Sequence, residues 1–114
     1  MSSACIFCRI ASKEVAAGIV HEDADVLAFY DLSPQAPTHV LVIPKRHVGT
    51  LDDVADGDAE LLGRMMLAAK RVAAAAGLAA GYRVVANCGA HAGQTVAHLH
   101  LHVLGGRPMS WPPG

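Results

Sequence analysis

The chain contains the sequence His98-Leu99-His100-Leu101-His102-Val103-Leu104, in which imidazole and aliphatic side chains alternate. Because successive side chains of a β-strand point to opposite faces, a strand here would place the imidazoles on one face and the aliphatic side chains on the other. Neighbours on one face lie about 6.5–7 Å apart, close enough for adjacent imidazoles to bind one small anionic group such as a phosphate. A merely solvated polar face would use Thr, Lys or Glu equally well. We therefore expect a strand over residues 95–104 with a core face and a chemical face.

The segments around this strand predict an α+β fold built on an antiparallel sheet. Further strands are expected over residues 19–22, 26–31, 38–43 and 83–87, and helices over residues 6–14 and 61–76. Asp23, Ala24 and Asp25 suit a hairpin turn between the first two strands, and Gly77 suits the end of the long helix. Strands and helices are segregated along the chain, which is typical of an antiparallel sheet, here with one long and one short helix.

Length and composition exclude several classes of protein. The 114 residues, 53% of them hydrophobic and 17% charged, suffice for one folded domain and are too apolar for a disordered chain. A formal charge of −1 provides no basic field for nucleic acid or an anionic membrane. The most apolar window, residues 72–82, is shorter than the ~18 residues of a membrane span, and no signal peptide is recognisable. Three cysteines, an odd number, favour a reducing compartment, so we expect a cytoplasmic protein.

The alternating segment resembles the signature of the histidine triad (HIT) family, His-x-His-x-His followed by two apolar residues. Further motifs that resemble the family extend over nearly the whole chain: Ala28-Phe29-Tyr30-Asp31, Ser33-Pro34-Gln35-Ala36-Pro37-Thr38-His39, Val42-Ile43-Pro44-Lys45, Gly105-Gly106-Arg107 and Trp111-Pro112-Pro113-Gly114. Residues 34–39 and the tail are similar to the HINT branch, the purine nucleoside phosphoramidases. The resemblance implies a single HIT-like domain over residues 1–114, an extended arm over residues 107–114, and a two-fold homodimer whose sheets run across the interface.

The resemblance also implies an activity, hydrolysis of the P–N bond in substrates of the AMP-amine type through a nucleotidyl-histidine intermediate. A neutral imidazole with a pKa of ~6.5 is a competent nucleophile near pH 7. The residues that match the family's catalytic positions are His100, as the nucleophile, with His102, His39 and Thr95. The expected ligand is a purine nucleoside monophosphate or phosphoramidate, and no catalytic cofactor is implied.

A larger set of residues matches the family's nucleotide-binding positions. It consists of Ile6, Phe7, Ile10, Phe29, Asp31, Leu32, Leu41, Asn87, Gly93, Gln94, Thr95, His100, His102 and Trp111. The apolar members would hold the purine base, Asp31 would accept the ribose hydroxyls, and Thr95 with backbone donors near Gly93 and Gln94 would bind the phosphate. Trp111, on the arm, is expected to help shape the site of the partner subunit. Without the resemblance, the apolar residues would be assigned to the core and Asp31 to a turn.

The pair Cys5-x-x-Cys8 predicts a metal site. Two thiolates at this spacing and two imidazoles would bind zinc tetrahedrally, and we assign His47 and His98 as the imidazole ligands. This assignment resembles the zinc-containing bacterial members of the family, which open with the same Cys-x-x-Cys. With four protein ligands the zinc would be structural. A thioredoxin-like motif is disfavoured because no strand precedes Cys5, and two ordinary buried cysteines are the remaining alternative.

Two other functions remain open at this level. In one, His98, His100 and His102 hold the catalytic ion of a metal-dependent hydrolase. In the other, the triad only binds the phosphate, and the protein is a nucleotide-binding adaptor. Two departures from the HINT pattern concern substrate preference: Thr95 stands where Ser is usual, and Ala97 stands where an aromatic residue is common.

An apolar stripe on the expected long helix bears on the oligomeric state. Leu61, Met65, Val72 and Ala76 recur at helical spacing and are more apolar than one thin α+β layer would leave open. The resemblance places this helix and the strand from Arg83 at a two-fold interface. By its pattern the stripe is either core or a subunit contact, and with the resemblance we expect it to contribute to the contact between subunits.

Overall fold

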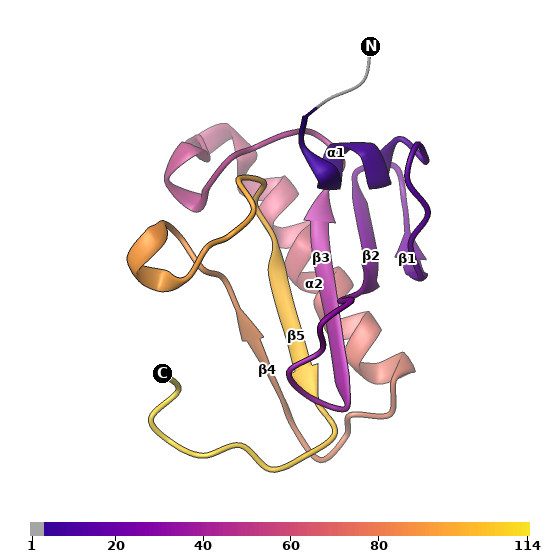
Figure 1. Cartoon of the computed structure of the whole chain (residues 1–114), viewed down its shortest axis with the longest axis vertical. Helices are drawn as coiled ribbons and strands as arrows, with labels where there is room; N and C mark the ends of the chain where they lie inside the picture. Colours follow the sequence, from indigo (N-terminus) through magenta and orange to yellow (C-terminus); the bar gives the residue numbers. More distant parts are fainter. Residues whose placement is uncertain (1–3) are drawn as a thin grey trace.

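The computed structural model describes residues 4–114 and contains one antiparallel sheet with a helix against each face (Figure 1). Its strands are β1 (Ile19–Glu22), β2 (Val26–Tyr30), β3 (Thr38–Pro44), β4 (Tyr82–Val85) and β5 (Leu101–Gly105), in the order β1-β2-β3-β5-β4. The long helix is α2 (Ala59–Ala75) and the short one is α1 (Ile6–Ala11). The expected α+β class, antiparallel sheet and pair of unequal helices are confirmed.

The core has two parts because the central strand β3 is covered on both faces. Val40 and Val42 pack on the α2 side, whereas Leu41 and Ile43 pack on the α1 side. This alternation follows from the two-residue period of a strand, and burial on both faces explains why β3 is continuously apolar. β5 lies next to β3, so it also sits near the middle of the sheet.

Helix α2 buries a face of small and flexible side chains against the sheet. Met65 and Val72 lie in the core, together with Ala68, Ala69 and Ala73. The expectation that a stripe with Met65 and Val72 contacts a second subunit is therefore wrong for these two residues. Their alanine neighbours let the helix approach the sheet closely, so that Met65 fills the space between them. Among the large apolar side chains of α2, Met66 and Leu67 are instead the exposed ones, at 52% and 50%.

The strand expected over residues 95–104 begins only at Leu101. The preceding segment bonds to the chain that follows β3: the Leu99 N–H donates to the Val48 carbonyl at 2.6 Å, and the Gln94 side chain donates to the Gly49 carbonyl. The alternation of side chains nevertheless continues through this irregular segment. Leu99, Leu101 and Val103 belong to the core beneath α2, as expected from the sequence.

Two other element boundaries differ from the sequence-based expectation. The short helix ends at Ala11 rather than at residue 14, and Lys13 adopts a left-handed φ of 68°, which cannot continue a helix. The strand expected over residues 83–87 is β4 (Tyr82–Val85), because β5 offers pairing partners only from Gly105 to His102. Three 3₁₀ turns complete the fold: η1 (Leu51–Asp53), η2 (Asp56–Asp58) and η3 (Ala90–Ala92).

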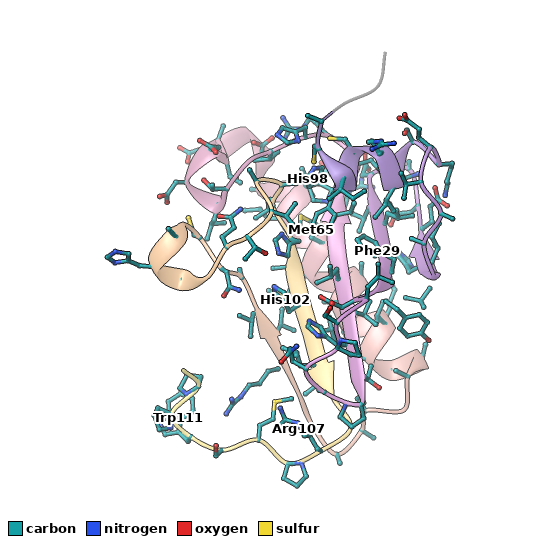
Figure 2. All side chains as sticks on the ribbon, in the orientation of Figure 1. Phe29, Met65, His98, His102, Arg107 and Trp111 are labelled. Carbon is teal, nitrogen blue, oxygen red and sulfur yellow. The ribbon has the colours of Figure 1, made fainter. Side chains whose placement is uncertain are left out.

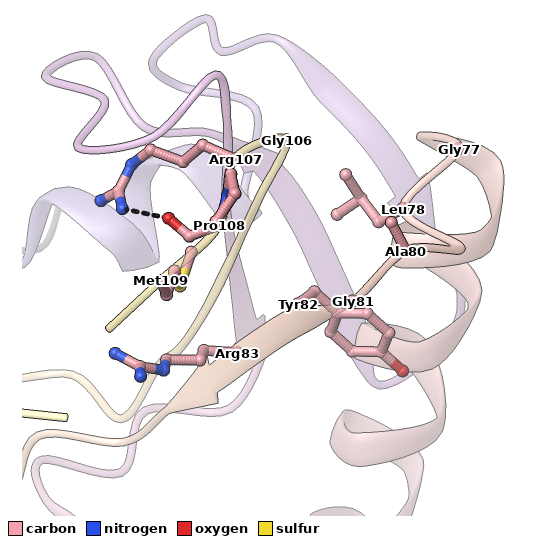
Figure 3. A pocket seen from close by; sticks show the side chains of 10 residues that line it. All are labelled: Gly77, Leu78, Ala80, Gly81, Tyr82, Arg83, Gly106, Arg107, Pro108 and Met109. Atoms are coloured by element: carbon pink, nitrogen blue, oxygen red, sulfur yellow. Dashed lines mark hydrogen bonds between the residues drawn. The ribbon is translucent and has the colours of Figure 1, made fainter. Parts of the chain in front are cut away.

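Beyond β5, the carboxyl-terminal segment contains no helix or strand and runs outward past the β4 edge of the sheet (Figure 1). Arg107 donates to the Gln35 carbonyl at 3.1 Å, and Arg83 on β4 donates to the Ser110 carbonyl. A groove of about 540 Å³ separates residues 106–109 from the turn between α2 and β4 (Figure 3). Within residues 4–114, no helix is both long and apolar enough to cross a bilayer.

Candidate active site

His39 on β3 and His102 on β5 are joined by a hydrogen bond between adjacent strands. The Gln35 backbone N–H donates to His39 Nδ1 at 3.0 Å, so a neutral His39 carries its proton on Nε2. That Nε2–H donates to His102 Nδ1 at 2.8 Å, which in turn places the proton of a neutral His102 on Nε2. The relay from Gln35 through His39 therefore orients His102 as a donor at Nε2.

The pKa values of His39 and His102 support the assignment of both rings as neutral. Burial lowers the pKa of His39, with a partial opposing effect from the Asp31 carboxylate. Burial, reinforced by the neighbouring His100 and His39 imidazoles, lowers the pKa of His102 to about 4. Both rings are therefore neutral near pH 7. His102 Nε2 is buried and makes no hydrogen bond to any other group of residues 4–114, so its N–H is an unsatisfied donor, available to a ligand.

His100 lies beside His102 and has the opposite tautomer. Its Nδ1 lies 2.6 Å from the His98 carbonyl oxygen, and only a protonated Nδ1 can donate to that oxygen. A neutral His100 therefore carries a lone pair on Nε2. The His100 and His102 ring centroids are 4.9 Å apart, so one ring offers a nucleophilic nitrogen next to the N–H of the other.

Asp31 directly follows β2 and lies at the edge of the histidine cluster. One carboxylate oxygen accepts the Ser33 N–H at 2.7 Å, and the other lies 3.5 Å from His39 Nε2. The side chain is partly exposed and retains acceptor capacity. The structure therefore places Asp31 next to the imidazoles, as a ribose-binding carboxylate would need to be.

The apolar residues expected around a base divide into two groups. Phe7, Ile10, Phe29 and Leu41 are buried together, and the Phe7 ring packs edge-on against Phe29 at 5.4 Å and against His100 at 5.2 Å. By contrast, Ile6 is exposed and Leu32 is 98% exposed. The buried group is therefore part of the core beside His100, whereas Ile6 and Leu32 lie on the protein surface.

The loop between β4 and β5 carries Asn87, Gly93, Gln94 and Thr95. The Gly93 and Gln94 N–H groups donate to the carbonyls of Ala90 and Gly89, so both are used within the loop. The Gln94 side chain accepts from the Gly89 N–H and donates to the Gly49 and Val96 carbonyls at 2.9–3.0 Å. Gln94 thus connects three segments and holds the exposed Thr95 between two anchored neighbours.

Trp111 is not part of its own subunit's histidine cluster. It is 82% exposed and lies at the end of the carboxyl-terminal segment, well separated from His102 (Figure 2). Its expected role at a partner's site stays a prediction.

Cys5, Cys8, His47 and His98 come together at the amino-terminal end of α1, with ligand atoms within 4.8 Å of one another. His98 Nδ1 lies 3.3 Å from Cys5 Sγ and 3.2 Å from His47 Nδ1, and Cys8 Sγ lies 3.2 Å from His47 Nδ1. A tetrahedral zinc ion keeps S and N ligands about 3.3–3.8 Å apart, so the donor set and its spacing fit zinc. His98 Nε2 donates to the Pro44 carbonyl at 2.8 Å, which leaves Nδ1 as the metal-binding nitrogen.

This geometry disfavours a catalytic ion held jointly by His98, His100 and His102. His98 Nδ1 points to the cysteines, while His100 Nδ1 donates to a carbonyl. A different trio, Asp31, His39 and His102, has converging side-chain atoms. Its two imidazoles share a hydrogen bond, however, and His39 cannot present a free Nε2 while its Nδ1 accepts from Gln35.

Comparison with known proteins defines the family. A model of the HIT domain matches residues 12–109. The chain belongs to the HIT domain family. It is 53% identical to an uncharacterized HIT-like protein of Synechocystis over 114 residues, the full length of both chains. Its fold matches a HIT family hydrolase from Legionella pneumophila with a TM-score of 0.94 and 54% identity, over 96% of this chain and 99% of that one.

A more distant HIT relative has a name that includes a ligand. The histidine triad nucleotide-binding protein of Candida albicans is 31% identical to this chain, with a TM-score of 0.82 over 97% of this chain and 85% of that one. The family resemblance read from the sequence is thus confirmed, whereas the HINT branch stays a prediction.

Three groups that orient the HIT site were not given that role from the sequence. They are the Gln35 N–H, the Pro44 carbonyl and the Gln94 side chain, which orient His39, His98 and the loop before Thr95. The first two are backbone groups that any residue possesses, so the sequence carries no signal for them. The family resemblance assigned backbone donors near Gln94 to phosphate binding and gave no role to its side-chain amide, which is engaged in bonds within the fold.

The buried neutral histidines predict that acid destabilises the protein. Because the pKa of His102 is about 4 in the folded state and ~6.5 when unfolded, only the unfolded chain takes up this proton between these values. The free energy of unfolding should therefore fall as the pH drops, by about 2 kcal/mol from pH 7 to pH 5 for this residue. Urea unfolding at both pH values measures the effect. His102→Gln should reduce the difference while Leu67→Gln, at an exposed side chain that does not titrate, should not; equal losses in all three proteins would contradict the assignment.

Proposed function

We propose that this protein is a purine nucleoside phosphoramidase that hydrolyses the P–N bond of AMP-amine substrates through a nucleotidyl-histidine intermediate on His100. The observation that carries the proposal is the pair of opposite tautomers, a lone pair on His100 Nε2 beside an N–H on His102 Nε2. Membership in the HIT family, the Legionella relative named as a hydrolase and the Candida relative named as nucleotide-binding support it. The similarity of residues 34–39 and of the tail to the HINT branch favours a phosphoramidate as substrate.

The reaction follows from these two nitrogens. His100 Nε2 attacks phosphorus, the P–N bond to the amine breaks, and the amine takes up a proton as it leaves. Water then attacks phosphorus, its hydroxyl stays on the nucleotide, and its second proton is released as neutral His100 is regenerated. His102 Nε2–H donates to a non-bridging phosphate oxygen and stabilises the charge that develops there in both steps.

Binding of the nucleotide uses the groups around the histidines. Asp31 accepts the ribose hydroxyls with the acceptor positions that Ser33 does not occupy. The base packs over the buried aromatic pair Phe7 and Phe29, with Ile6 and Leu32 closing over it. We assign the remaining phosphate contacts to the Thr95 hydroxyl and Asn87, because the Gly93 and Gln94 N–H groups already donate within the loop.

We further propose that Cys5, Cys8, His47 and His98 hold a structural zinc ion. All four tetrahedral positions would be filled by the protein, so this ion would have no open position for water and would tie α1 to the sheet. Cys5 also accepts the Cys8 N–H through its sulfur, so the first turn of α1 is already shaped around the ligands.

A two-fold dimer along β4 is consistent with the exposed surface. β4 is an edge of the sheet and pairs only with β5 among residues 4–114. Tyr82 on β4 and Met66 on α2 are exposed apolar side chains that pairing of two copies would cover. The carboxyl-terminal segment leaves the subunit on the β4 side, so it would carry Trp111 toward the partner's site (Figure 1).

The alternative function, a nucleotide-binding adaptor, shares the binding groups and lacks the covalent step. Replacement of the nucleophile separates the two. His100→Asn should reduce turnover of an adenosine phosphoramidate by at least 10³-fold and leave the AMP affinity within about tenfold, since the nucleophile acts after the ground state. His21→Asn is the control and should be as active as wild type. Turnover by His100→Asn near the wild-type rate, or no covalent adduct in wild-type rapid-quench samples, would contradict the proposal.

The zinc proposal predicts about one zinc per chain in protein purified without chelator. Cys8→Ser should lose most of this zinc because it removes a thiolate ligand, whereas Cys88→Ser, at a cysteine outside the cluster, should retain it. Elemental analysis of the three proteins measures the effect. Equal zinc content in both variants, or none in wild type, would show that the cluster is not a zinc site.

The proposed dimer makes a prediction about the arm. Removal of residues 109–114 keeps Arg107, whose guanidinium donates to the Gln35 carbonyl, and removes Trp111. The truncated protein should remain dimeric by light scattering, with a nearly unchanged melting temperature, and should rank amine leaving groups differently in kcat/KM. Trp111→Ala should reproduce the altered ranking. Unchanged selectivity in both proteins would mean that the arm lies outside the site.

A further inference from the structure

His98 belongs to the cluster with Cys5, Cys8 and His47 and also contacts His100. Its imidazole is fully buried and held at both nitrogens, by the Pro44 carbonyl at Nε2 and by the cysteine and histidine cluster at Nδ1. Its backbone carbonyl accepts the Nδ1–H of His100 at 2.6 Å. One residue therefore contributes a ligand atom to the four-residue cluster and the acceptor that fixes the tautomer of the proposed nucleophile.

Phe7 provides a second connection between the same two places. It lies between Cys5 and Cys8 in α1, and its ring packs edge-on against both His98 at 5.8 Å and His100 at 5.2 Å. The first turn of α1 is shaped by the Cys5 sulfur, which accepts the Cys8 N–H. The cluster residues therefore also set where the ring that contacts the nucleophile lies.

We propose that His98 is a positioning residue that couples the Cys5, Cys8, His47 and His98 cluster to the nucleophile, so that metal binding at the cluster holds the proton of His100 on Nδ1. This inference rests on the proposed function in taking His100 Nε2 as the attacking atom. The metal would then be required for full activity although the cluster lies outside the group of His39, His100 and His102.

The physical reason lies in what the cluster brings together. Two sulfurs and two imidazole nitrogens meet within 4.8 Å, with the two Nδ1 atoms only 3.2 Å apart. A divalent ion gives all four side chains one common partner and fixes them together, whereas hydrogen bonds between thiols and imidazoles hold them only in pairs. The His98 ring and the peptide bond between His98 and Leu99 together set where the His98 carbonyl lies, since the Leu99 N–H holds that peptide to the Val48 carbonyl and the cluster holds the ring. A His100 ring that loses its acceptor can carry the proton on Nε2, and that tautomer cannot attack phosphorus.

The test compares replacement of one metal-binding side chain with a matched substitution away from the cluster. His47 is the exposed ligand, so His47→Asn opens the cluster without emptying a core position, and His21→Asn is the control. The main measurement is ¹⁵N NMR of the His100 ring in the absence of substrate, which reports directly which nitrogen carries the proton. Zinc content, AMP affinity and kcat for an adenosine phosphoramidate are measured on the same samples.

We expect His47→Asn to lose most of its zinc, to shift His100 toward the Nε2–H tautomer, and to lower kcat about tenfold or more with AMP affinity within threefold. Chelation of wild-type protein should shift the His100 signals in the same way, and added Zn²⁺ should reverse it. His21→Asn should match wild type in every measurement.

Retention of the Nδ1–H tautomer of His100 after zinc is removed would overturn the proposal. A finding that wild-type protein contains no zinc as purified would also overturn it. Loss of the dispersed NMR spectrum on chelation would also overturn it, because the cluster would then act on the whole fold rather than on His100. The tautomer measurement needs no substrate. A wild-type protein that lacks phosphoramidase activity but shows the zinc-dependent shift would therefore refute the proposed function and leave the coupling intact.

Discussion

The burial of Leu99, Leu101 and Val103 beneath α2 is the constraint on which the rest of the site depends. A strand or extended segment alternates its side chains, so anchoring these aliphatic residues in the core directs the intervening histidines to the opposite face. On that face Phe7 of α1 packs against His98 and His100. The result is that His98 and His100 are buried polar groups, and each needs a hydrogen-bond partner.

Those partners are mostly backbone atoms, and they determine what each imidazole can do. Three chemically identical side chains within five residues are held in three different ways because different groups face them. His98 donates to the Pro44 carbonyl and His100 to the His98 carbonyl, whereas His102 accepts from another imidazole. The direction of each hydrogen bond leaves a different nitrogen available. Chemistry at this site is therefore set by the path of the main chain as much as by the choice of side chain.

The sequence predicted the elements whose patterns are local. The β3 segment, the hairpin before it and the long helix follow from apolar periodicity and turn residues, and the cluster of Cys5, Cys8, His47 and His98 assembled as assigned from the family resemblance. The late start of β5 was not predicted, because the Leu99 N–H bonds to the Val48 carbonyl and the Gln94 side chain to the Gly49 carbonyl, both of which lie beyond the end of β3. Likewise, the sequence could not show that Met65 faces the sheet and Met66 the solvent, since adjacent methionines have the same local pattern and only the helix orientation separates them.

The Gln94 side chain has a consequence for how this protein tolerates change. Its bonds to Gly89, Gly49 and Val96 close the loop at its base, so the atoms that position Thr95 and the following histidines lie below the loop rather than in it. The residues at the tip, Ala90 to Ala92, are exposed and contribute no side chain to that closure. Insertions or grafted peptides at the tip would extend into solvent without displacing the anchored base. This makes the loop a suitable place to attach a reporter or a recognition sequence next to an intact site.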